Sequence, residues 1–166
     1  PLKKLLPILQ LSKVNFIDLQ YGDTNLEKNL LKQQFKIDIK KIDNIDSLND
    51  IDSLSALIDA CDIIITTSNV TAHIAGALGK TVYLLAPCSL ARIWYWHNIN
   101  HYSLWYPSIK IFNQEKILSW AEPIEKVKNE LENFIAGKFD ATVSDIRTTF
   151  LIFRIQNDQD LQMNFH

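Results

Sequence analysis

Apolar residues along this chain alternate between short β-branched runs and stripes at helical spacing. The short runs predict buried strands at residues 14–19, 37–42, 63–65, 80–87 and 109–112. The stripes predict helices at 24–35, 51–61, 71–79 and 119–137, after a short amphipathic lead-in at 2–11. Strands that alternate with helices indicate an α/β fold, with a Rossmann-like parallel sheet of about five or more strands and helices on both faces.

The pattern divides the chain into a Rossmann-like domain at 1–137 and a C-terminal extension at 138–166. Within the extension, residues 148–155 are compatible with a strand and equally with a docked helix, so the structure of the extension stays open. Because the chain begins with Pro1 rather than Met, we expect it to be a piece of a longer protein.

A polar turn in the middle of the chain lies between a strand and a helix. The strand is 63–65, the turn is 66–71, and the helix that follows has Ile74 and Leu78 on one face and Gly79 at its end. In parallel sheets, ligands bind outside the carboxyl ends of the strands. A turn at that edge directs backbone N–H groups and hydroxyls at a common point, where an anion is favoured.

Two interpretations of this turn stay open. One Ser, Thr or Asn would be enough to cap the helix, which is worth about 1 kcal/mol. Because the run of polar residues exceeds that need, Ser68, Asn69 and Thr71 are candidates to bind a phosphate. His73 would be either a neutral, hydrogen-bonded structural residue or a donor to a diphosphate oxygen.

Two other loops would meet the turn at the same edge of the sheet. The residues that follow the first strand are Gln20, Tyr21 and Gly22. The loop at 88–108 is rich in aromatic residues, namely Trp94, Tyr95, Trp96, Trp105 and Tyr106. About half of these rings would form a satellite core, and the others would stack on a sugar or a base. Arg92 is the only Lys or Arg in this loop, so it is the candidate to pair with a negative ligand.

Other motifs favour helix caps over chemistry. Thr24-x-x-Glu27 and Ser119-x-x-Glu122 predict capping boxes. Asp50-Ile51-Asp52 matches a D-x-D metal pattern, but both aspartates stand where a helix begins, and capping explains them better. The chain has no dinucleotide fingerprint, no P-loop, no Cys/His cluster at metal spacing and no nucleophile elbow. We therefore predict no cofactor and no metal.

Composition narrows the possible partners. A net charge of −2 without a basic run gives no basis for nucleic-acid binding, and no apolar segment approaches the roughly 20 residues that span a bilayer. Cys61 and Cys88 would lie at opposite ends of neighbouring parallel strands, too far apart for a disulfide. Reduced thiols indicate a cytoplasmic location.

Four segments, in their order along the chain, resemble one family. They are FIDLQYG at 16–22, the stretch 49–62, the stretch 66–80 that ends in HIAGALGK, and SLWYPS at 103–108. Together they resemble the C-terminal half of a GT-B glycosyltransferase, in the heptosyltransferase-like bacterial group that is often joined to tetratricopeptide repeats. The resemblance covers roughly residues 14–135. The chain departs from it at Asn113, where the family tends to have Arg, and after Gly137.

The resemblance implies a domain that binds a nucleotide-diphosphate sugar, whose sugar is transferred to an unknown acceptor. It implies that the diphosphate lies on Ser68, Asn69, Thr71 and His73. It implies that the nucleotide or sugar borders Gln20, Tyr21, Gly22, Arg92, Trp94 and Trp96. The catalytic base and the acceptor site would lie in a separate N-terminal domain, so this chain alone is expected to be inactive. A non-catalytic nucleotide-sensing or protein-interaction module of the same fold, and a nucleotide-sugar epimerase, are the alternatives.

Overall fold

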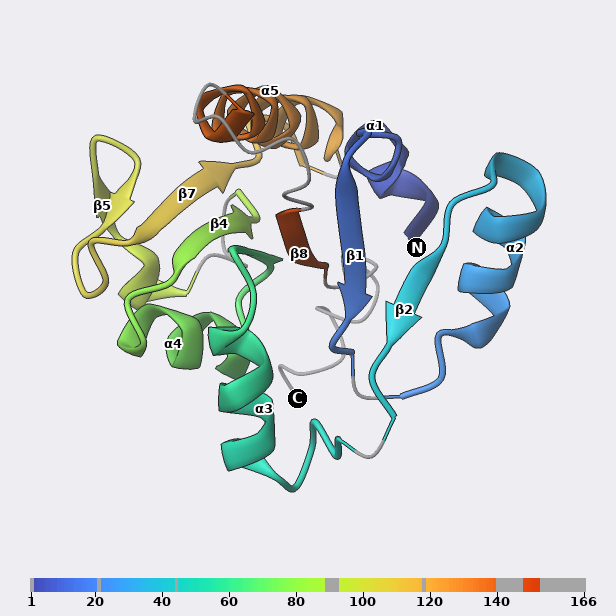
Figure 1. The fold of residues 1–166 in the computed structure, drawn as a ribbon. Helices are drawn as coiled ribbons and strands as arrows, with labels where there is room; N and C mark the ends of the chain where they lie inside the picture. Colours follow the sequence, from blue (N-terminus) through green and yellow to red (C-terminus); the bar gives the residue numbers. More distant parts are fainter. Residues whose placement is uncertain are drawn as a thin grey trace.

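A mainly parallel sheet lies between two layers of helices (Figure 1). The computed structural model describes residues 2–20, 22–43, 45–88, 93–117, 119–139 and 148–152. The observed architecture confirms the predicted α/β, Rossmann-like class with helices on both faces of the sheet.

The described strands form one sheet in the spatial order β2-β1-β8-β3-β4-β7-β6-β5. The parallel strands are β1 (Val14–Asp18), β2 (Ile39–Lys41), β3 (Ile63–Thr66), β4 (Thr81–Ala86), β7 (Ile109–Asn113) and β8 (Thr148–Ile152). A short antiparallel hairpin of β5 (Asn98–Ile99) and β6 (Tyr102–Ser103) extends the sheet beyond β7. The carboxyl ends of β1, β3, β4 and β7 therefore lie along one edge, which is where ligands bind in such sheets.

Helices cover both faces of the sheet. One face carries α1 (Leu6–Leu9), which follows a 3₁₀ helix at Leu2–Leu5, together with α2 (Asn25–Phe35) and α5 (Ala121–Phe139). The other face carries α3 (Ile51–Asp59), α4 (Val70–Ala77) and a 3₁₀ helix at Trp94–Trp96. Along β3, Ile63 and Ile65 join the first core and Ile64 joins the second. A strand covered on both faces has to be apolar throughout, which explains the run of isoleucines.

The C-terminal extension supplies a strand to the centre of the sheet. β8 pairs in parallel with β1 on one side and with β3 on the other. The structure therefore shows the strand alternative for residues 148–152. The path from β7 through α5 to β8 runs in the same direction, and over the same face, as the path from β1 through α2 to β2. Both crossovers thus share one hand, as parallel sheets require.

Both predicted capping boxes are wrong. The Thr24 side chain makes no capping bond to α2, and the Glu27 carboxylate instead accepts the Leu2 N–H at 2.7 Å. The Trp120 carbonyl accepts the Ile124 N–H at 3.1 Å, so α5 begins one residue later than a Ser119 cap requires. At Glu27, a tertiary contact with Leu2 thus replaces the local signal.

Candidate functional site

The polar turn between β3 and α4 is built around Asn69. This residue has an extended backbone, and its Oδ1 accepts the Ala72 N–H at 3.2 Å, so it caps α4. Its Nδ2 donates to Thr66 Oγ1 at 2.9 Å, which ties the cap to the end of β3. Asn69 therefore fulfils the capping interpretation, and the general geometry of helix ends leaves other first-turn N–H groups of α4 without intrahelical acceptors.

Small residues let α4 approach the sheet closely. Its buried side chains are Thr71, Ala72 and Ala75, whereas Leu78, on the face that the spacing suggested, is exposed. A Cβ at Gly76 would lie 2.6 Å from the Tyr106 ring. Gly76 thus lets α4 pack closely against Tyr106 of the aromatic loop.

The helix ends as predicted at Gly79, which adopts the left-handed conformation with φ of 69°. The Lys80 N–H bonds to the Ala75 carbonyl and the Gly79 N–H bonds to the Gly76 carbonyl, a Schellman arrangement. This explains Gly79 without any ligand.

Trp96 joins the polar turn to the aromatic loop. Its side chain is 1% exposed, and its Nε1–H donates to Ser68 Oγ at 2.8 Å. Its ring stacks on His73, with centroids 4.9 Å apart and planes at 25°. Trp96 therefore belongs to the second core, which is the satellite-core alternative for this ring.

His73 sits in an aromatic surround. The rings of Tyr95 and Tyr106 form T-shaped pairs with its ring, and the Tyr106 hydroxyl lies 3.3 Å from its Nδ1. Desolvation by burial lowers the pKa of His73 below its usual value of 6.5, so the imidazole is neutral at pH 7. A neutral ring can still donate one hydrogen bond to an anion.

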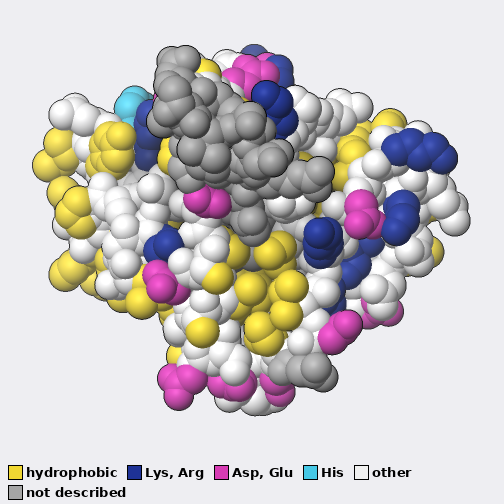
Figure 2. Space-filling model, viewed as in Figure 1, with side chains coloured by type: hydrophobic (Ala, Val, Ile, Leu, Met, Phe, Trp, Pro, Cys, Tyr) yellow, Lys and Arg dark blue, Asp and Glu magenta, His cyan; other side chains and the backbone are white. Residues whose placement is uncertain are grey.

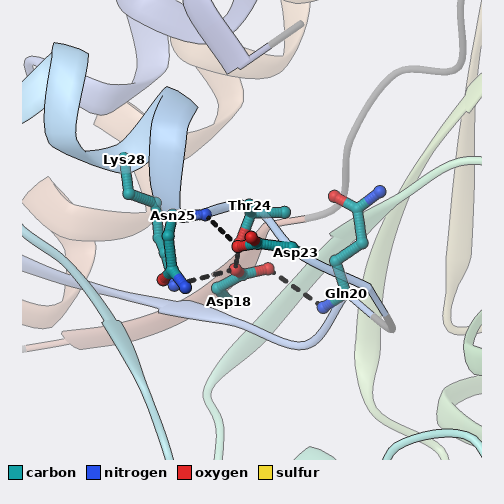
Figure 3. Close-up of polar contacts among 6 residues, drawn as sticks. All are labelled: Asp18, Gln20, Asp23, Thr24, Asn25 and Lys28. Atoms are coloured by element: carbon teal, nitrogen blue, oxygen red, sulfur yellow. Dashed lines mark hydrogen bonds and ion pairs between the residues drawn. The ribbon is translucent and has the colours of Figure 1, made fainter.

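A second polar cluster lies at the carboxyl end of β1 (Figure 3). Asp18 is buried; its Oδ1 accepts the Gln20 N–H at 2.9 Å, and Oδ2 accepts the Thr24 hydroxyl and pairs with Lys28 Nζ at 3.3 Å. Asp23 Oδ1 accepts the Asn25 N–H at 2.8 Å. These contacts fix the loop that leads from β1 into α2.

The structure thus brings together some of the predicted site residues and not others. Ser68 and His73 both contact Trp96, through the hydrogen bond and the stacking described above. Trp94, by contrast, is 68% exposed, with its ring edge-on to Tyr95. Gln20 and Gly22 belong to the loop after β1. Tyr21 and Arg92 lie outside the described residues.

Sequence reasoning missed Gln114, a buried side chain at the carboxyl end of β7. Its Oε1 accepts the Cys88 N–H at 3.3 Å, and its backbone N–H donates to the Ala86 carbonyl at 2.9 Å. Within the described parts of the chain, its Nε2 is buried and has no hydrogen-bond partner. A polar residue directly after a buried strand, at the edge where ligands bind, was the signal that would have found it.

Two hollows lie away from this turn. One, of about 610 Å³, opens at the amino end of β1 and is lined by Asn15, Phe35 and Lys40 among others. The other, of about 400 Å³, lies between β7 and α5 and is lined by His101, Asn113 and Glu130 among others. Neither is lined by a predicted binding residue, because those follow the ends of β1, β3 and β4.

The described residues also bear on the cysteines, on Asp50, and on metal and membrane binding. Cys61 and Cys88 are free, as the strand directions predict, and burial raises the pKa of Cys61 to about 11. Asp50 caps α3, since its side chain accepts the Ser53 N–H at 3.0 Å. In the described parts of the chain, no group of His, Cys, Asp and Glu is arranged to hold a metal, and no helix is long and apolar enough to cross a bilayer.

The chain is similar to Protein FlbA of Caulobacter vibrioides, with 33% identity over 132 residues that cover 79% of this chain. The match covers 21% of FlbA, so the chain spans about a fifth of the length of this curated relative. No family model matches the chain, and no solved structure matches it. The fold class therefore rests on the structure itself.

Proposed function

We propose that this domain binds the nucleotide-diphosphate sugar of a glycosyltransferase. The observation that carries the proposal is the turn between β3 and α4, at the carboxyl edge of a parallel sheet. The turn leads into a helix whose first N–H groups favour an anion. Asn69 already accepts one of them, the Ala72 N–H. Ser68 and Thr71 supply hydroxyls beside those groups, and they are the remaining candidates for diphosphate oxygens.

His73 supports the proposal through its position in the first turn of α4. Its neutral ring is held by Trp96 and Tyr106, and a diphosphate nearby would favour the charged form. The proposed role is that of a donor to a diphosphate oxygen, with Trp96 fixing the ring. Because a leaving diphosphate can be stabilised by such donors and a helix N-terminus, the proposed chemistry needs no metal.

We propose that the catalytic base and the acceptor site lie outside this domain. In this proposal the chain binds the donor weakly and does not transfer sugar by itself. Gln20 and Gly22, in the loop after β1, would border the nucleotide or sugar together with the outer aromatic side chains of the 88–108 loop.

The experiment is a calorimetric titration of UDP, ADP and GDP into the chain and two variants. We expect at least one nucleotide to bind at millimolar concentration or below. Thr71→Val replaces a buried hydroxyl by a methyl of similar size and is expected to weaken binding about tenfold. Thr81→Val is the matched control, because Thr81 begins β4 and so lies at the edge of the sheet opposite to the turn. If none of the three nucleotides binds at millimolar concentration, the proposal is rejected.

A second candidate, the protein-interaction module, is favoured by one observation. Side chains around the hairpin are exposed although they are large and apolar, namely Trp94, Ile99, Leu104 and Trp105. Figure 2 shows hydrophobic side chains gathered on the side of the molecule that carries β5. Exposed apolar groups of this kind often mark contact surfaces. Nucleotide binding that never leads to turnover, even in the longer protein, would favour a non-catalytic nucleotide-sensing module instead.

A further inference from the structure

One buried carboxylate, that of Asp18, holds the loop between β1 and α2. The Asp18 side chain is 3% exposed, and it contacts the Gln20 N–H, the Thr24 hydroxyl and the Lys28 ammonium (Figure 3). The partners lie two, six and ten residues further along the chain. Asp18 therefore fixes both the start of the loop and the start of α2.

This arrangement is costly to build. Burying a carboxylate and an ammonium removes both from water, and apolar residues of similar size would pack with comparable stability. Lys28 also lies near the amino end of α2, where the helix dipole disfavours a cation. The contribution that apolar residues could not supply is a fixed backbone position at Gln20.

The side-chain amide of Gln20 indicates why a fixed backbone position is needed there. Its side chain points away from Asp18 (Figure 3), and its Oε1 is buried without a hydrogen-bond partner among the described residues. A buried amide oxygen left without a partner is unfavourable unless a donor meets it. Asp18 Oδ1 accepts the Gln20 N–H at 2.9 Å and so holds the backbone from which this side chain projects.

We propose that Asp18 is a positioning residue that aims the Gln20 amide at the bound nucleotide-diphosphate sugar. The inference rests on the proposed function above. The group that meets Gln20 would be a hydroxyl or N–H donor of the nucleotide or sugar. In this proposal Asp18 itself does not touch the ligand. Lys28 and Thr24 hold the Asp18 carboxylate in its position.

Two double variants separate positioning from charge. Asp18→Asn with Lys28→Met removes the ion pair but keeps a carbonyl oxygen for the Gln20 N–H. Asp18→Leu with Lys28→Met has nearly the same size and removes that acceptor as well. Both lose the same charges, so the difference between them reports the bond to Gln20. Lys32→Met is a further control. Lys32 lies on α2, as Lys28 does, and this variant breaks its exposed ion pair with Asp38.

Two measurements are made on each variant: exchange of the Gln20 amide hydrogen in the free protein, and the dissociation constant of the nucleoside diphosphate that the wild type binds. We expect the Asn variant to stay within about threefold of wild type in both, and the Leu variant to change about tenfold in both. Unchanged values in the Leu variant overturn the proposal, and so does faster exchange with unchanged affinity.

The same design keeps the two proposals apart. A wild type that binds no nucleoside diphosphate rejects the proposed function, and with it the ligand of Gln20. In that case amide exchange still decides whether Asp18 fixes the loop. Should the Leu double variant fail to fold, Gln20→Leu replaces it in the binding assay. Affinity equal to wild type in that variant would also overturn the inference.

Discussion

The His73 imidazole packs against Tyr95, Trp96 and Tyr106, and its burial lowers the pKa below 6.5. The unfolded state keeps the ordinary value, so it binds a proton at a pH where the folded state does not. The stabilising contribution is complete above pH 6.5 and is lost as the pH falls through the folded pKa.

We predict that the free energy of unfolding decreases between pH 7 and pH 5 more steeply in the wild type than in His73→Gln. Urea unfolding at a series of pH values measures this difference, and an NMR titration of the imidazole gives the pKa directly. A folded pKa at or above 6.5 would contradict the described burial. A rise in that pKa on adding a nucleoside diphosphate would support a bound anion near the ring.

Gly76 gives a second prediction at the residue scale. A Cβ there would lie 2.6 Å from Tyr106 and 2.9 Å from Ile109, so Gly76→Ala should destabilise the protein by about 1–3 kcal/mol through overpacking. Gly137→Ala, in α5, meets no atom within 4 Å and should be neutral or stabilising by up to about 1 kcal/mol. Thermal unfolding of both variants checks the contrast, and equal effects would show that the contact with Tyr106 is absent.

At the scale of elements, the aromatic loop is docked onto α4 through Trp96. We predict that Trp96→Phe lowers stability by about 1–2 kcal/mol, because it removes the bond to Ser68 Oγ and part of the stack on His73. The pKa of His73 should move toward 6.5 as water reaches the ring. Trp94→Phe, at an exposed side chain, should change neither quantity. A large effect of Trp94→Phe on stability would show that the two rings have been assigned the wrong roles.

The sequence predicted the parallel strands and the helices well, since period and β-branching report burial directly. It did not predict the β5–β6 hairpin. That hairpin turns at Asn100 and His101, with φ of 51° and 69°. Asn and His are both enriched in this left-handed conformation and were a usable signal, but strands of two residues show no alternation.

At the scale of the whole molecule, β8 completes the sheet between β1 and β3. The local sequence pattern can indicate a strand, but it does not indicate which other strands that strand pairs with. The position of β8 could therefore not be predicted from the sequence. The same limit applies to the site. The edge where the loops meet could be predicted from parallel strands, whereas the contacts of Ser68 with Trp96 and of Asp18 with Lys28 depend on distant packing.

We predict that deleting residues 140–166 abolishes cooperative unfolding or lowers the midpoint strongly, because β1 and β3 lose the strand that joins them. Urea unfolding followed by circular dichroism measures this. A chain that ends at Ile152 keeps β8 and serves as the control. An unchanged midpoint after the longer deletion would contradict the central position of β8.

The claim that the N-terminus of α4 holds a diphosphate is tested most directly by Val70→Pro. Val70 is the first residue of α4 and is 58% exposed, so proline fits there and removes one N–H without breaking the helix. Asn69 is extended, which suits the residue before a proline. Titration with the nucleoside diphosphate that the wild type binds should show about tenfold weaker binding for Val70→Pro and unchanged binding for Val70→Ala. Wild-type affinity in a folded Val70→Pro variant would contradict the account.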